Sequence, residues 1–145
     1  MKFIIGSDHA GLALKAALKA ALEDMGHSVE DAGPETTEST DYSRYALQVA
    51  RAVSSGTYER GILICGTGLG MSMAANRVRG VRAALCHNEY MARMSRAHND
   101  ANVLCLGERV IGLGLALSIL EAWVGTEFEG GRHQRRLDIF DQVNN

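Results

Sequence analysis

The sequence lacks long apolar runs, a regular cysteine spacing and a surplus of basic charge, and each absence excludes a class of protein. No stretch reaches the roughly 18 apolar residues that a bilayer-spanning helix requires. Only five residues separate Lys2 from the first acidic residue, Asp8, which is too few for the apolar part of a signal peptide. A net charge of -2 offers no excess of cations for a nucleic-acid backbone. We therefore expect a cytoplasmic protein that binds neither membranes nor nucleic acid.

Cysteine is also scarce. The chain has three cysteines, Cys65, Cys86 and Cys105, which lie about twenty residues apart. An odd number at this spacing fits neither a disulfide framework nor the usual zinc-ligand spacings. No C-x-x-C motif occurs, so a redox protein is a distant alternative. We expect three free thiols.

The remaining pattern is typical of one globular α/β domain covering residues 1–145, a length that suits a single hydrophobic core. Short apolar runs with β-branched residues alternate with longer amphipathic stretches, which predicts successive βαβ units and a parallel sheet. The expected strands cover residues 2–6, 28–31, 61–65, 81–86 and 103–106. The expected helices cover residues 12–25, 42–55, 70–78, 89–97, 112–124 and 132–143.

Chemically useful residue types follow the expected strands, at the edge where open α/β sheets bind their ligands. Asp8 and His9 follow the first strand, Cys65 ends the third, His87 follows the fourth and Arg109 follows the fifth. Asp8 could orient the His9 imidazole, although neighbours on a strand point to opposite faces. We expect a polar site at this edge.

The segment CGTGLG, residues 65–70, places three glycines between a strand and a helix. Such a loop lets backbone N–H groups surround an anion, but it can equally be a tight turn that allows close packing. It does not match G-x-G-x-x-G, because Met71 occupies the third glycine position, so dinucleotide binding is not supported. At Cys65, the start of the helix would stabilise a thiolate that could act as a base. The alternative is an ordinary core cysteine, which is how we interpret Cys86 and Cys105.

Two further groups allow both a functional and a structural interpretation. His98 and Asn99 end an expected helix, where residues of this kind often form caps and turns. Arg132 and Arg136 are four residues apart and share a helix face, so they could bind a phosphate together or form a solvated basic face.

Taken together, four ordered segments resemble the ribose-5-phosphate isomerase B and galactose-6-phosphate isomerase family over essentially the whole chain. The segments are GSDHAG, ILICGTGLGMSMAANR, SRAHNDANVLCLGERVIG and FEGGRHQRR. The resemblance implies a three-layer α/β/α Rossmann-like fold with a five-stranded parallel sheet, and no metal or cofactor. It also implies homodimers or homotetramers whose active sites are shared between subunits, with the helix at residues 132–143 packing on the partner.

The resemblance also implies a role for each matching residue. Cys65 would be the base that moves a proton between two sugar carbons through an enediolate, and His98, helped by Asp8, would open the furanose ring. The intermediate would be stabilised by Thr67 and by the backbone of Gly66, Gly68, Leu69 and Gly70. The phosphate would be bound by His9, Arg109, Arg132 and Arg136, with Asn99 near the reacting end. Some members carry the base as a glutamate, but residues 71–76 contain no acid, which favours the cysteine-base subgroup.

The predicted activity is therefore the interconversion of ribose 5-phosphate and ribulose 5-phosphate in the pentose phosphate pathway. The first alternative is isomerisation of allose 6-phosphate or galactose 6-phosphate, in which one more carbon changes the span between base and phosphate. The second is a non-catalytic sugar-phosphate-binding subunit, which the presence of both Cys65 and His98 disfavours.

Overall fold

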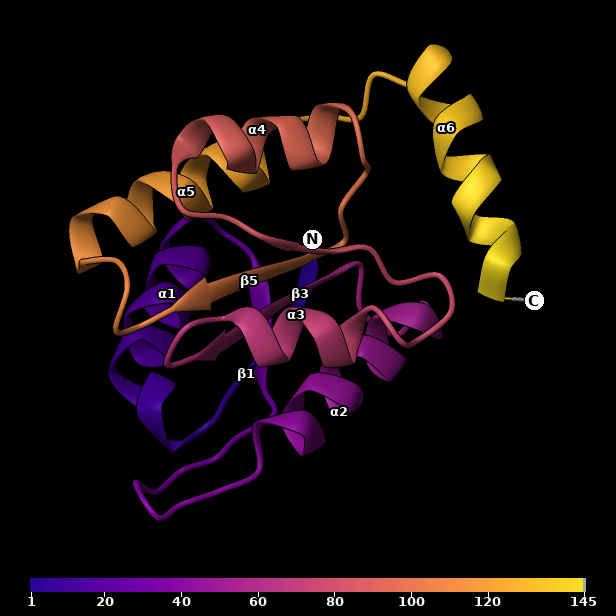
Figure 1. The fold of residues 1–145 in the computed structure, drawn as a ribbon. Helices are drawn as coiled ribbons and strands as arrows, with labels where there is room; N and C mark the ends of the chain where they lie inside the picture. The colour runs from indigo at the N-terminus through magenta and orange to yellow at the C-terminus, as the bar shows by residue number, and fades with distance from the viewer. Residues whose placement is uncertain (145) are drawn as a thin grey trace.

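A five-stranded parallel sheet forms the centre of the computed structural model, which describes residues 1–144 (Figure 1). Its strand order is β2-β1-β3-β5-β4. The strands are β1 (Lys2–Ser7), β2 (Ser28–Asp31), β3 (Arg60–Cys65), β4 (Ala83–Leu85) and β5 (Val103–Gly107). The central strands read as continuous apolar runs because the sheet is covered on both faces.

Helices cover both faces of the sheet and create two separate apolar layers. They are α1 (Leu12–Asp24), α2 (Tyr42–Ser54), α3 (Leu69–Ala75), α4 (Glu89–Ala97), α5 (Leu113–Gly125) and α6 (Arg132–Asp141), with short 3-10 turns at His9–Gly11 and Gln142–Asn144. One apolar layer joins the sheet to α1, α4 and α5 and includes the buried Phe3 and Trp123. The other joins the sheet to α2 and α3 and includes Val49 and Met71. This arrangement confirms the predicted α/β/α fold with a five-stranded parallel sheet.

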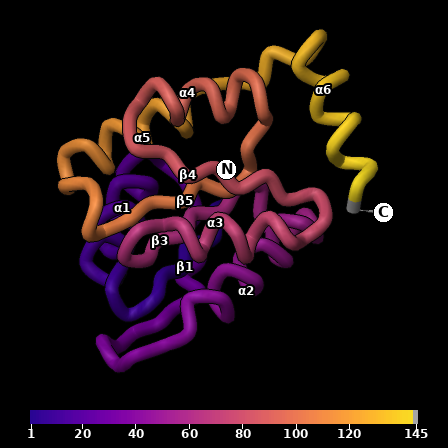
Figure 2. The backbone as a smooth tube through the Cα atoms, in the orientation of Figure 1, coloured from indigo at the N-terminus to yellow at the C-terminus, as the bar shows by residue number. Residues whose placement is uncertain are grey.

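The last helix, α6, stands apart from the three layers (Figures 1 and 2). Of its residues, only His133 and Leu137 are buried, four positions apart on one face. Ile139 and Phe140 are 68% and 45% exposed. An open groove of about 570 Å³ lies beside the end of this helix, and Arg82, Asn99 and Phe140 are among its lining residues. The described chain therefore leaves much of α6 uncovered.

The predicted elements are all present; most ends agree to within one residue, and the shift is larger at three places. The fourth strand covers only Ala83–Leu85, and the helix expected at residues 70–78 is Leu69–Ala75. One residue explains both differences: the side-chain amide of Asn76 donates to the Ala83 carbonyl and accepts from the Ala83 N–H, so the chain leaves the helix there. The helix expected at residues 132–143 ends at Asp141 and continues as a 3-10 turn. Across residues 1–144, none of the helices is long and apolar enough to cross a membrane.

Candidate active site

The carboxyl ends of β1, β3 and β5 are hydrogen-bonded to one another and form one edge of the sheet. The chain reverses its direction of strand addition between β1 and β3, which is where open α/β sheets bind ligands. The Asp8 N–H donates to the Ile64 carbonyl at 3.1 Å, and the Glu108 N–H donates to the Cys65 carbonyl at 2.9 Å. The residues that follow the three strands are therefore neighbours, as the sequence predicts.

Cys65 is the last residue of β3, and its side chain is only 5% exposed. Its Sγ accepts a hydrogen bond from the Gly68 N–H at 3.1 Å, so the glycine loop folds back over the sulfur. Gly68 has a φ of +79°, and a side-chain carbon there would lie 2.6 Å from Leu85 Cδ1. The loop is thus a tight turn, as one of the two interpretations of its sequence has it, and its Gly68 N–H is directed at the Cys65 sulfur.

The other two cysteines are unsuited to proton transfer. Cys86 and Cys105 are buried free thiols. Burial raises the pKa of the Cys86 thiol to about 11 and raises that of Cys105 further. Both thiols therefore stay protonated near neutral pH, which agrees with their interpretation as core residues.

Two side chains approach the glycine loop from other elements. A side-chain carbon added at Gly66 would lie 3.4 Å from the Arg109 guanidinium. The backbone N–H of Arg109 also donates to the Gly66 carbonyl at 3.0 Å. At Gly70, a side-chain carbon would meet the Tyr42 ring at 2.6 Å. Arg109 lies where the sequence predicts. Tyr42 was not predicted, and its only sequence signal is an exposed aromatic residue at the start of α2 after a polar loop.

Asp8 and His9 are bound to different partners. The Asp8 carboxylate accepts from the Ala10 N–H at 2.9 Å and caps the first 3-10 turn. The Nδ1 atom of His9 accepts from the Thr40 N–H at 3.2 Å. A neutral imidazole whose Nδ1 accepts carries its proton on Nε2. His9 therefore offers one N–H donor, and its orientation is set by the Thr40 backbone.

Four predicted site residues lie at the opposite edge of the sheet. His98 and Asn99 directly follow α4 and precede β5, whereas Arg109 follows β5. Because β5 has five residues and a parallel strand rises about 3.3 Å per residue, the two edges are roughly 13 Å apart. Arg132 and Arg136 lie on α6, which Figure 1 places at the amino end of β5, away from its arrowhead. Within one chain, these residues are not brought together with Cys65.

A partly buried charge network holds the turn after His98. Asp100 has a φ of +44°, a left-handed conformation that few residues other than glycine adopt. Its carboxylate accepts from Arg82 at 3.1 Å and from Arg96 at 2.9 Å. Arg82 also donates to Asp141 at 3.2 Å, which joins this turn to the end of α6. These contacts stabilise the unusual backbone and connect the turn to the last helix.

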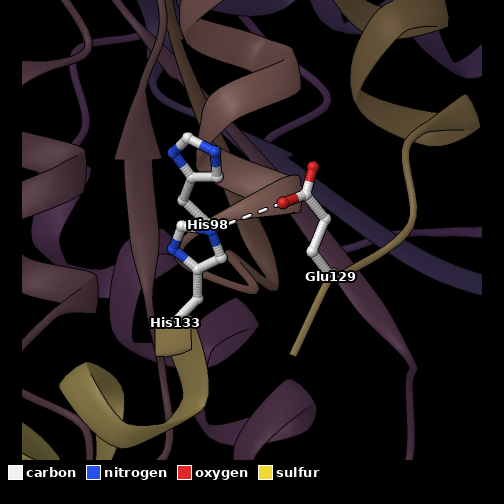
Figure 3. A group of neighbouring side chains, drawn as sticks. All are labelled: His98, Glu129 and His133. Atoms are coloured by element: carbon white, nitrogen blue, oxygen red, sulfur yellow. Dashed lines mark ion pairs between the residues drawn. The ribbon is translucent and has the colours of Figure 1, made fainter. Parts of the chain in front are cut away.

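His98, Glu129 and His133 form a group whose ligand atoms all lie within 4.8 Å of one another (Figure 3). The His98 and His133 rings are stacked, with centroids 4.1 Å apart and planes 11° from parallel. A metal ion binds an imidazole in the plane of its ring, so two stacked, nearly parallel rings cannot direct their lone pairs at one ion. The stacked pair therefore does not form a metal site in this arrangement.

Comparisons with known proteins agree with this geometry. The sequence model of a family described as Ribose/Galactose Isomerase matches residues 3–140. Ribose-5-phosphate isomerase B of Escherichia coli (strain K12) is 51% identical over 98% of this chain and 95% of its own length. D-erythrulose-4-phosphate isomerase 2 of Mycolicibacterium smegmatis is 45% identical over 89% of this chain and 87% of its own. The solved structure of Clostridium thermocellum ribose-5-phosphate isomerase B has a TM-score of 0.97 and 55% identity, covering 99% of this chain and 97% of that one. The chain belongs to the ribose/galactose isomerase family.

Proposed function

We propose that this chain is one sugar-phosphate isomerase domain that interconverts D-ribose 5-phosphate and D-ribulose 5-phosphate, with Cys65 as the base. The observation that carries the proposal is the sulfur of Cys65 beneath the glycine loop, at the edge where the carboxyl ends of β1, β3 and β5 meet. The named isomerases of ribose 5-phosphate among its relatives add support. The reaction requires one mobile proton and stabilisation of one oxyanion, which protein groups can supply without a metal or cofactor.

We assign the opening of the furanose ring to His98, helped by Asp8, and the proton transfer then takes place on the open-chain sugar. The Cys65 thiolate removes the proton from C2 of the aldose, and the electron pair of that C–H bond forms a double bond between C1 and C2. The negative charge then lies on O1 as an enediolate. After a proton moves from O2 to O1, the Cys65 thiol returns its proton to C1 and the ketose forms.

The glycine loop is suited to stabilise the enediolate. The Gly68 N–H points at the sulfur at 3.1 Å, and the exposed Thr67 hydroxyl lies next to it on the loop. Donors that are fixed before the reaction stabilise a developing oxyanion without reorganising. We assign this role to Thr67 and to the backbone of Gly66, Gly68, Leu69 and Gly70.

The phosphate is bound by donors from both edges of the sheet. His9 offers its Nε2–H and Arg109 its guanidinium at the edge that carries Cys65. Arg132 and Arg136 are exposed on α6 and lie one helical turn apart, so two guanidinium groups point from one face. We propose that Asn99 binds near the reacting end of the sugar.

The two groups of site residues meet only if a second copy of the chain contributes one of them. We propose a homodimer, or a homotetramer built from such dimers, in which α6 of one subunit packs on its partner. The exposed Ile139 and Phe140 beside the open groove are the apolar surface that such a contact would cover. His98, Asn99, Arg132 and Arg136 would then reach Cys65 of the neighbouring subunit. The buried free thiols are in keeping with a cytoplasmic location.

Steady-state assays with several sugar phosphates test the function. We expect the purified protein to have its highest kcat/KM with ribose 5-phosphate, and activity that resists a metal chelator. Allose 6-phosphate, galactose 6-phosphate and D-erythrose 4-phosphate are the comparison substrates. A clearly higher kcat/KM with any of them would replace ribose 5-phosphate as the substrate. Calorimetric binding of ribose 5-phosphate with no turnover of any sugar would instead favour a binding subunit.

Substitution of Arg136 by alanine is expected to raise KM about tenfold or more and to leave kcat nearly unchanged. A charge-assisted hydrogen bond to phosphate contributes about 1.5–3 kcal/mol, and 1.4 kcal/mol corresponds to about a factor of ten. Arg135→Ala is the matched control. Arg135 is also an exposed arginine of α6, but it is not one of the two arginines, 132 and 136, that are predicted to bind the phosphate. An unchanged KM in Arg136→Ala would remove this residue from the phosphate site.

A further inference from the structure

His133 is a buried histidine with no role in the reaction described above. The residue is 4% exposed, although its neighbours Arg132 and Gln134 on α6 are exposed. The imidazole ring lies face to face with His98, with 4.1 Å between centroids and 11° between planes (Figure 3). The only buried histidine of α6 is thus in contact with the residue to which ring opening is assigned.

The position of His133 is fixed by the packing of α6. One helical turn later, Leu137 is also buried on the same face. Glu129 precedes the helix and donates its N–H to the Ala97 carbonyl at 3.0 Å, which ties this segment to the end of α4. The Glu129 carboxylate also lies 3.4 Å from His133 Nε2 (Figure 3). Burial and stacking on His98, rather than a hydrogen bond, therefore hold the His133 ring, because its Nε2 has no hydrogen-bond partner among the described residues.

The charge state of His133 favours this arrangement. Burial lowers the pKa of the His133 imidazole, and the nearby His98 and Arg132 lower it further. A neutral His133 ring does not repel the positive charge that His98 gains when it accepts a proton. A charged residue at this position would oppose the same step.

We propose that His133 is a positioning residue that holds the His98 imidazole in the orientation needed to open the sugar ring, and couples that orientation to the phosphate-binding arginines on α6. The inference rests on the proposed function, because it acts through the role assigned to His98. Arg132 precedes His133 and Arg136 follows it by three residues, so one rigid helix sets the distance from the phosphate to the ring-opening histidine. Proton transfer depends on such distances, since a misplacement of about 1 Å can cost roughly 100-fold in rate.

Two substitutions separate the stacking surface from the volume of the side chain. His133→Phe keeps a flat ring against His98, and His133→Leu keeps a similar apolar volume without a flat face. With ribose 5-phosphate, we expect the phenylalanine variant to keep kcat within about threefold of the wild type. We expect the leucine variant to lose roughly 10- to 100-fold in kcat with little change in KM. Thermal unfolding of both variants reports whether the fold is intact.

A substrate that cannot cyclise tests whether the effect passes through ring opening. In D-erythrose 4-phosphate, the C4 hydroxyl that would close a five-membered ring carries the phosphate, so the sugar needs no ring opening. We expect His133→Leu to turn over this sugar at nearly the wild-type rate. Equal losses with both sugars would overturn the proposal, as would equal kcat values for the two variants with ribose 5-phosphate. Failure of the wild type to convert ribose 5-phosphate would instead reject the proposed function.

Discussion

Cys65→Ala is expected to abolish the isomerisation of ribose 5-phosphate and to leave the fold intact. Alanine at this position cannot accept the proton from C2, and a positioned base contributes roughly 10²- to 10⁴-fold to such a rate. The fold should persist because the change removes a single sulfur atom at the end of β3 and leaves a small cavity. Steady-state kinetics combined with thermal unfolding measure the two effects separately.

Cys86→Ala is the matched control for this substitution. Cys86 is also a buried free thiol, but the raised pKa of its thiol, about 11, keeps it protonated at neutral pH. We expect this variant to retain nearly full kcat, with at most a small loss of thermal stability. If Cys65→Ala keeps even a tenth of the wild-type kcat, Cys65 is not the base, and another group must move the proton.

Mixing two inactive variants is expected to restore activity. Cys65→Ala removes the proposed base at one edge of the sheet, and His98→Asn removes the proposed ring-opening histidine at the other. In a dimer with shared sites, a mixed pair combines both defects in one site and leaves the other site complete. If subunits exchange at random in an equal mixture, half of the dimers are mixed, which predicts about a quarter of the wild-type activity.

The control is a mixture of variants that damage the same edge, such as Cys65→Ala with Thr67→Ala. Every site in that mixture carries a defect from one edge, so no complete site can form. The variants should be unfolded and refolded together, so that subunit exchange is assured. If the mixture of Cys65→Ala with His98→Asn stays inactive under these conditions, each chain contains a complete site by itself. The two edges, roughly 13 Å apart, must then come together within one chain.

The sequence predicts one edge of the sheet better than the other. Asp8, Cys65 and Arg109 each follow an apolar run, and parallel pairing brings the ends of such runs together whatever the details of packing. The end of α4 at Ala97 agrees with the predicted helix, but the pairing of Asp100 with Arg82 joins distant segments and does not follow from local pattern.

The two unpredicted contacts have a similar explanation. Tyr42 contacts Gly70 across 28 positions of sequence, and His133 contacts His98 across 35. Both depend on how separate helices pack against distant segments, which neither hydrophobic periodicity nor residue type records. The resemblance of four segments to a known family indicated the correct family and fold, but it did not show that these two side chains meet their partners.

The uncovered surface of α6 makes the specific activity of this protein depend on its concentration. On the shared-site proposal, the helix that carries Arg132 and Arg136 acts only while a second chain is bound, so the number of working sites follows mass action. Specific activity should then fall on dilution below the dissociation constant of the dimer and return on reconcentration. Under this proposal, the amount of protein that a cell makes sets both the total activity and the activity per chain.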